Sequence, residues 1–366
     1  MLSVIALVLV GAAAGPVRPV DSRTQPALAQ SRPAAGQRYL YVALPGPDDA
    51  GADRSVRILV FDIANGHRLV RRIPVWPGRA DEAEVVRGTA ASTRAGRLYI
   101  STTNRLAAID LKTDQVVWEK SYDGGHCCDR FAISPDGQTI YAPAFGSAKW
   151  YVVAAATGDL RAAIAVTGWP RETIYSRDGR QAYLAAWDSP TLSVSDTGRH
   201  EIVRSVGPFS ASLCPFTVNA AGTLVFANVD GLVGFEVGDL QTGLILERVA
   251  AEGYDKDAAA KYECPSHGIA FTPDERELWV ADGVQNRLHV FDAGVFPPVV
   301  RAAIALSSQP RWIAFSIDGR FAYSSTGDIV DAAARKVIGA LQDAAGAKVT
   351  SEQFVEIDFV DGQPVR

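Results

Sequence analysis

The stretch Phe131-Ala-Ile-Ser-Pro-Asp-Gly-Gln-Thr-Ile-Tyr141 decides the fold, because it places a tight turn between two short apolar segments. Asp-Gly between two such segments predicts a β-hairpin, since the turn needs backbone with positive φ. The same pattern recurs along the chain, and each copy ends in Tyr, Phe or Trp. The other copies are 90–99, 173–183, 216–226, 269–279 and 313–323. The chain is therefore built from a repeated unit.

The spacing of the turns measures that unit. The turn positions are Gly96, Gly137, Gly179, Gly222, Glu275 and Gly319, separated by 41, 42, 43, 53 and 44 residues. The longest interval contains a charged, alanine-rich insertion at 252–263. A second hairpin follows each of the first ones, so that one unit holds four short strands in about 42 residues. This is the size of one β-propeller blade.

The two ends of the chain supply a seventh unit. Three predicted strands near the N-terminus lack an innermost partner, at 38–44, 56–62 and 67–74. A lone strand is predicted at 353–359, and pairing it with these three would close a ring and remove two exposed sheet edges. We predict an all-β, seven-bladed propeller over 37–360, with a short tail at 361–366. Residues 255–261 are the only modest helix candidate.

The first residues predict export. Leu2–Ala14 is an apolar run too short to span a bilayer comfortably and long enough for the core of a signal peptide. Ala27-Leu28-Ala29 fits a small-x-small cleavage site, which makes 1–29 the predicted signal peptide and 30–36 a linker. No other apolar run approaches 18 residues, so we expect no membrane span after cleavage. The expected location is the periplasm or the exterior.

Composition excludes several classes of protein. Apolar residues make up 48 % of the chain and charged residues 21 %, which is typical of globular proteins and not of disordered or collagen-like chains. The net charge of −5 excludes a generally basic nucleic-acid binder, so no nucleic-acid partner is expected. We expect a monomer.

The Ser-Pro-Asp-Gly hairpins, followed by a turn of the type Val-x-Asp-x-x-Thr-Gly that Val153 to Gly158 matches loosely, resemble the YVTN or YncE-like propeller repeat family. The resemblance covers nearly the whole predicted mature chain and implies the propeller fold. Relatives in fold include lactonases and the large subunit of quinoprotein amine dehydrogenases. The repeat glycines make turns, and no functional residue is carried over from the motif.

The loops that enter the innermost strand of each blade lie on one rim of the ring, where propellers usually carry their sites. All four cysteines occupy this position, which is not expected of scattered residues. They are Cys127, Cys128, Cys214 and Cys264. The same loops carry the candidate ligand-binding residues Arg87, His126, Asp129, Arg130, Arg171, Glu172, His267, Arg311 and Trp312.

Three interpretations of this rim compete. Disulfides could brace it, with Cys214–Cys264 as the best pair; Cys127 and Cys128 are not expected to bond, because adjacent Cα atoms lie about 3.8 Å apart and disulfides usually need at least about 4.4 Å. A divalent metal could bind to Cys128, Cys264 and His267. The arginines could instead bind an anionic ligand, or simply pair with Asp129, Glu172 and other acids.

These interpretations lead to three functional hypotheses. The first is an exported, non-catalytic propeller that binds a small ligand or a protein partner at the rim. The second is a metal-dependent hydrolase similar to the propeller lactonases, whose divalent ion would be held by Glu172, Asn228 and Asp282. The third is a scaffold subunit of a periplasmic redox complex.

Overall fold

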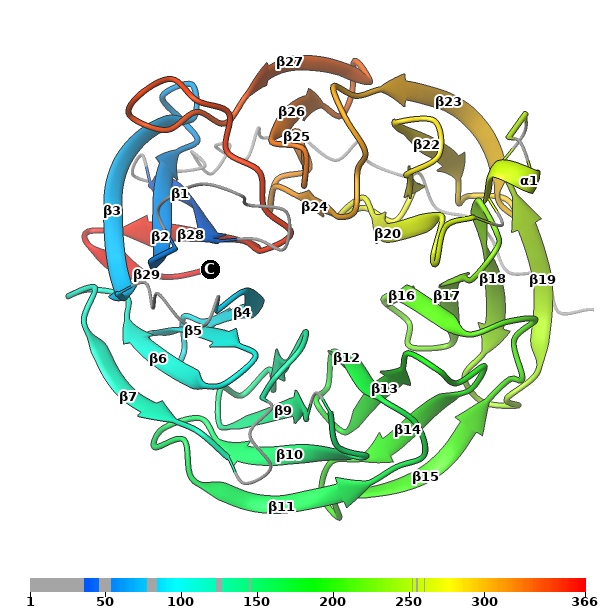
Figure 1. The fold of residues 1–366 in the computed structure, drawn as a ribbon, viewed down its shortest axis with the longest axis horizontal. Coiled ribbons are helices and arrows are strands. Elements are labelled where there is room, and N and C mark those ends of the chain that lie inside the picture. Colours follow the sequence, from blue (N-terminus) through cyan, green and yellow to red (C-terminus); the bar gives the residue numbers. More distant parts are fainter. Residues whose placement is uncertain are drawn as a thin grey trace, which may run out of the picture. The chain divides into compact units, whose positions relative to one another are not determined.

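The computed structural model describes residues 36–45, 54–77, 84–122, 127–144, 146–251, 253–254, 256–259 and 261–366. The predicted signal peptide and nearly all of the predicted linker lie outside these residues. The described chain forms seven antiparallel sheets that follow one another around a ring in chain order (Figure 1). The prediction of an all-β, seven-bladed propeller is confirmed.

Each blade from the second to the seventh consists of four consecutive strands. Blade 2 holds β4 (Val86–Ser92), β5 (Arg97–Thr102), β6 (Leu106–Asp110) and β7 (Val116–Lys120). Blade 3 holds β8 (Ala132–Ile133), β9 (Thr139–Pro143), β10 (Lys149–Ala154) and β11 (Leu160–Ala165). Blade 4 holds β12 (Pro170–Tyr175), β13 (Gln181–Ala186), β14 (Leu192–Asp196) and β15 (Glu201–Val206). In each blade the first strand is innermost.

The remaining blades follow the same order. Blade 5 holds β16 (Leu213–Val218), β17 (Leu224–Val229), β18 (Gly234–Asp239) and β19 (Ile245–Ala250). Blade 6 holds β20 (Ser266–Phe271), β21 (Glu277–Asp282), β22 (Arg287–Asp292) and β23 (Val299–Ala305), and blade 7 holds β24 (Ile313–Phe315), β25 (Phe321–Ser324), β26 (Asp328–Asp331) and β27 (Lys336–Ala340). The short helix α1 (Lys256–Ala259) lies in the predicted insertion.

Blade 1 joins the two ends of the chain. It holds β1 (Gln37–Leu44), β2 (Val56–Asp62) and β3 (Arg68–Trp76), with β28 (Phe354–Val360) paired antiparallel to β1. This is the predicted closure, and the red β28 lies beside the blue β1 in Figure 1. The residues after it are more than a tail, because β29 (Gln363–Pro364) pairs with the end of β28.

The hairpin motif forms because its side chains accept hydrogen bonds from the backbone amides of the turn. The Ser134 hydroxyl donates to Asp136 and accepts from the Thr139 amide at 2.9 Å, and the Asp136 carboxylate accepts from the Gln138 amide at 3.0 Å. Gly137 has a φ of 75°, and a Cβ there would lie 2.5 Å from the Ser92 hydroxyl. The motif therefore specifies both the turn and its packing on the preceding blade.

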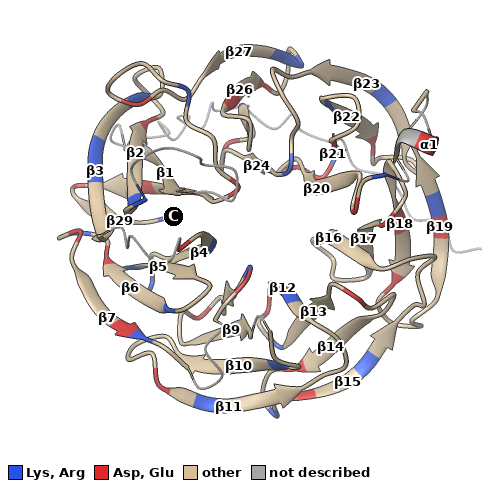
Figure 2. Cartoon of the chain, viewed as in Figure 1, with Lys and Arg blue, Asp and Glu red and all other residues tan. Residues whose placement is uncertain are grey.

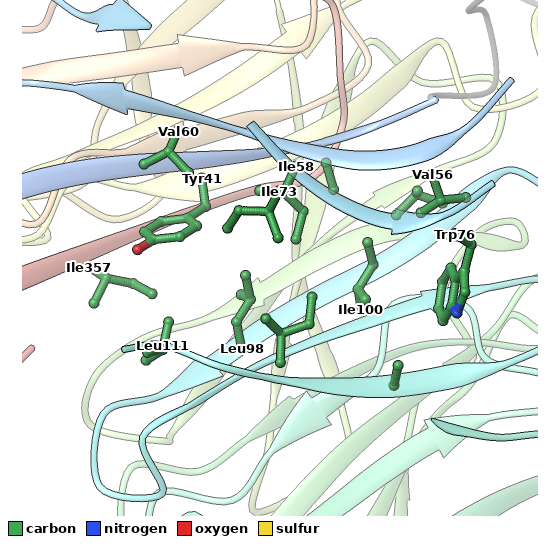
Figure 3. Packing of buried hydrophobic residues seen from close by; sticks show 14 of the residues in the cluster. Tyr41, Val56, Ile58, Val60, Ile73, Trp76, Leu98, Ile100, Leu111 and Ile357 are labelled. Atoms are coloured by element: carbon green, nitrogen blue, oxygen red, sulfur yellow. The ribbon is translucent and has the colours of Figure 1, made fainter. Parts of the chain in front are cut away.

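The core of the described chain consists of seven apolar clusters, and each fills the interface between two neighbouring blades. Figure 3 shows the cluster between blades 1 and 2, where Tyr41, Val60 and Ile357 face Leu98 and Leu111. The clusters arise because alternate strand residues point to opposite sheet faces, and both faces are covered by neighbours. The packing between blades thus holds the inner loops in place.

Candidate functional site

The rim loops meet near the ring axis in a cluster of buried charged side chains, which we call the axial cluster. Its members come from five blades, and each is less than a tenth exposed except Arg311, Trp312 and Trp187. They are Glu352 of blade 1, Asp129 and Arg130 of blade 3, Arg171, Glu172 and Trp187 of blade 4, His267 of blade 6, and Arg311 and Trp312 of blade 7. Figure 2 shows charged positions on the outer strands and also at the inner ends of several blades.

Arg130 is neutralised inside this cluster. Its Nη2 donates to Glu352 at 2.5 Å, and its guanidinium lies 4.5 Å from the centre of the Trp312 ring. The second oxygen of Glu352 lies 3.1 Å from Nε of Arg311, so that one carboxylate forms ion pairs with two arginines. Burial acts to lower the pKa of Arg130, and the attraction of Glu352 and the neighbouring acids outweighs it and raises that pKa.

Arg171 has no such partner. Its Nη2 donates to Nε2 of His267 at 2.7 Å, and its guanidinium stacks 3.8 Å from the centre of the Trp187 ring. No carboxylate oxygen among the described residues lies within 4.0 Å of it, and its buried Nε and Nη1 have no hydrogen-bond partner there. Burial and the nearby Arg130 lower the pKa of Arg171 to about 10.

His267 acts as a neutral acceptor. Its Nδ1 lies 3.0 Å from the Arg311 carbonyl oxygen, which can only accept, so Nδ1 carries the proton and Nε2 receives the Arg171 hydrogen bond. Burial, together with Arg130 and Arg171, holds the pKa of His267 well below its usual range. The histidine therefore orients Arg171 without neutralising it, and Asp129, Glu172 and Glu352 attract its charge only from beyond ion-pair distance.

Glu172 is one of the three buried acids of the cluster. It accepts from the Phe216 amide at 3.3 Å, a contact between blades 4 and 5. Burial raises the pKa of this carboxyl to about 7, although Arg130 and Arg171 act in the opposite direction. Near neutral pH the side chain is therefore divided between its protonated and ionised forms.

Replacing Glu172 with glutamine is expected to change the pH dependence of stability. A carboxyl with a pKa of about 7 in the folded protein and 4.5 in the unfolded chain makes folding less favourable as pH rises from 4.5 to 7. The Glu172→Gln variant lacks this loss, so its stability relative to the native protein should grow across that window by up to about 3 kcal/mol. Urea unfolding at pH 4.5, 6 and 8 measures the difference, and a constant offset at all three values would contradict it.

The cysteines form two disulfides. Cys214 and Cys264 are bonded as predicted, linking the inner ends of blades 5 and 6. Cys127 and Cys128 are also bonded to each other, and the expectation that they would not bond is wrong. That expectation assumed a trans peptide, whereas the peptide between them is cis and their Cα atoms are 3.3 Å apart.

The disulfides correct the expected cysteine–histidine metal set. Cys128 and Cys264 present no thiolate to a metal, and His267 uses both ring nitrogens in hydrogen bonds. In the part of the chain that the structure describes, no group of three His, Cys, Asp or Glu side chains could hold a metal ion.

Each residue of the expected oxygen-ligand set makes hydrogen bonds within the protein. Asp282 accepts from Nε2 of His289 at 2.9 Å and from two loop amides. The Asn228 amide donates to the Gly234 carbonyl at 2.7 Å, and Glu172 accepts from the Phe216 amide at 3.3 Å. Each of the three residues thus has hydrogen-bonding partners of its own.

The other predicted rim residues have simpler roles. Asp129 is buried and accepts from the Arg130 amide at 3.1 Å, and the Arg87 carbonyl accepts from the Gln353 side chain at 3.1 Å. His126 lies outside the described residues. Sequence reasoning missed Glu352, which occupies the entry position of the closing strand. Extending the repeat register to blade 1 would have found it.

Comparisons with known proteins support the fold alone. No family model matches the chain, and no curated protein matches it. Among solved structures, hydrazine synthase from Kuenenia stuttgartiensis is similar, with a TM-score of 0.56 and 22 % sequence identity over 67 % of this chain and 76 % of that chain. In the described residues no helix is long and apolar enough to cross a membrane. The chain thus has the fold of a seven-bladed propeller, and its chemistry must be inferred from its own residues.

Proposed function

We propose that this propeller is a binding protein whose axial cluster takes up a small anionic ligand, such as a carboxylate. The observation that carries the proposal is Arg171, which is buried, stacked on Trp187 and left with two unused donor nitrogens. A buried charge without an acid at ion-pair distance is costly, and a directly bound anion would reduce that cost. Guanidinium groups are the usual partners of carboxylates and phosphates.

The surrounding residues suit such a ligand. Arg130 and Arg311 share Glu352, so Arg171 is the cluster's arginine without an acid at ion-pair distance among the described residues. Glu172 can hold or release a proton near neutral pH, which would let the cluster adjust its charge when an anion enters. We propose no catalytic step.

Export remains part of the proposal. The expected signal peptide at 1–29 and the two disulfides support an oxidising compartment, because structural disulfides persist in the periplasm and outside cells. The similarity of the hairpins to YVTN or YncE-like repeats supports membership of that family.

Thermal unfolding in the presence of anions tests the binding site. Succinate and inorganic phosphate are added at increasing concentration, with sodium chloride at matched ionic strength as the reference. We expect at least one of them to raise Tm, since a ligand at 100 times its Kd stabilises by about 2.7 kcal/mol. The Arg171→Gln variant should lose that rise, and should be as stable as the native protein or more so without ligand, because an unpaired buried charge is removed.

Arg180→Gln is the matched control, since Arg180 is an exposed arginine of the same blade and its variant should behave as the native protein does. Anions that act only through ionic strength, or that act equally on the Arg171→Gln variant, would overturn the proposal.

A further inference from the structure

A groove between blades 3 and 4 forms a second concave site, separate from the axial cluster. Its volume is about 610 Å³, within the range of ligand-binding clefts. Strands β10 and β11 and the residues after them line one side, and strands β13 to β15 line the other (their positions can be followed in Figure 1). The lining residues are Trp150, Ala165, Val166, Thr167, Leu184, Ala186, Ser189, Thr191, Ser193, Ile202 and Ser205.

The repeat register explains why the groove occurs here. In each blade, the residue three positions before the last residue of the third strand is paired with a residue of the fourth, outermost strand. In blade 1 these two strands are β2 and β3. In blade 4 this pair is Ser193–Ser205. The other blades place at least one larger side chain in the equivalent pair: Leu59–Arg72, Ala107–Glu119, Tyr151–Ala163, Glu236–Arg248, His289–Ala303 and Asp328–Ala340. Two serines therefore leave space that the other blades fill.

The apolar packing at this interface is also reduced. The cluster between blades 3 and 4 has the fewest buried members of the seven, and Ala182 and Ala186 are among its contributions from blade 4. Trp150 is fully buried, and its ring is fixed by a 2.9 Å hydrogen bond from Nε1 to the Thr173 hydroxyl. The groove therefore has a rigid aromatic residue in its wall.

The chemistry of the lining selects the ligand. None of the lining side chains is charged, and five carry hydroxyls. The hydroxyls of Thr167, Thr191, Ser193 and Ser205 make no hydrogen bond to the described protein, so their donor and acceptor capacity is available. A charged ligand would find no counter-charge, and an apolar ligand would leave these hydroxyls unsatisfied.

We propose that this groove binds a neutral polyhydroxylated ligand, a carbohydrate without acidic groups. Sugar hydroxyls both donate and accept hydrogen bonds, as the lining hydroxyls do, and the C–H faces of a sugar ring can lie against the accessible side chains of Val166 and Ile202. Ile202 is 37 % exposed and stands at the open side of the groove. The site does not depend on the axial cluster.

A glycan array probed with the labelled full-length protein tests the proposal. The native protein should bind neutral glycans, and isothermal titration with the best of them should give a measurable Kd. Ser193→Leu introduces the side chain found at the equivalent position of blade 1 and should abolish binding by filling the groove. The double variant Thr167→Ala/Ser205→Ala hardly changes the volume and should weaken binding at least 10-fold.

Glu201→Ala is the matched control, because Glu201 is exposed on β15 and does not line the groove. Circular dichroism and Tm establish that each variant is folded, and the double variant decides the question if Ser193→Leu does not fold. Absence of glycan binding by the native protein, binding only to sialylated or sulfated glycans, or binding unchanged in the groove variants would overturn the proposal.

Discussion

A chain that ends at Gln353, and so lacks β28 and β29, is expected to lose cooperative unfolding altogether. Removing β28 strips β1 of its inner partner from Gln37 to Val42. It also removes Ile357 and Phe359 from the cluster between blades 1 and 2. Each deleted large apolar side chain costs about 2–5 kcal/mol, and the total stability of a domain is about 5–15 kcal/mol.

A second contribution comes from Glu356, which accepts from Arg38 at 2.6 Å and from the Ile317 amide at 2.8 Å and thereby ties blade 7 to blade 1. Far-UV circular dichroism during heating and size-exclusion chromatography measure the outcome. Deleting only 361–366 is the control and should leave a cooperative transition, because it spares β28. A chain ending at Gln353 that unfolds cooperatively near the native Tm would contradict the role of the closing strand.

The second large effect is expected at Glu352, the carboxylate shared by two arginines. Glu352→Gln leaves Arg130 buried without its closest counter-charge, and breaking a buried ion pair in this way costs about 3–5 kcal/mol. Urea unfolding gives the free energy of unfolding. Asp178→Asn breaks an exposed pair with Arg180 and should cost less than about 1 kcal/mol.

The double variant Arg130→Met/Glu352→Leu distinguishes loss of a charge partner from loss of packing. Removing both charges leaves no buried arginine without its paired acid, and Arg311, the other partner of Glu352, is partly exposed to water, so the pair of substitutions should cost less than the sum of the single ones. Additive costs, or a Glu352→Gln variant as stable as the control, would show that Arg130 is neutralised by other groups.

The repeat made the fold predictable from sequence, because local and global signals agree in it. Ser134, Asp136 and Gly137 specify a hairpin by contacts within a few residues, and the spacing of such hairpins counts the blades. Closure by β28 followed from the need to cover a strand edge. None of this required knowledge of side-chain contacts between distant residues.

The axial cluster could be predicted only in part. The register placed Arg130, Arg171 and His267 on one rim, and the structure brings them together. Which acid pairs with which arginine depends on distances across the ring, and Glu352 was overlooked. The Cys127–Cys128 bond depends on a local peptide geometry that residue identity does not reveal. The groove was missed because it results from small side chains meeting across a blade interface.

The Cys214–Cys264 bond has a consequence for the integrity of the ring. The whole of blade 5 lies between these two residues, so the bond encloses that blade in a covalent loop. A proteolytic cut anywhere from 215 to 263 would leave both pieces attached to each other. The insertion at 252–263, whose described residues Gly253 and 261–263 are exposed, falls inside this stretch, so a cut there would not release a fragment. Blade 1, by contrast, is closed by the pairing of β28 with β1, which come from opposite ends of the chain and are held together by hydrogen bonds and packing alone. We therefore expect the ring to open first between these two strands.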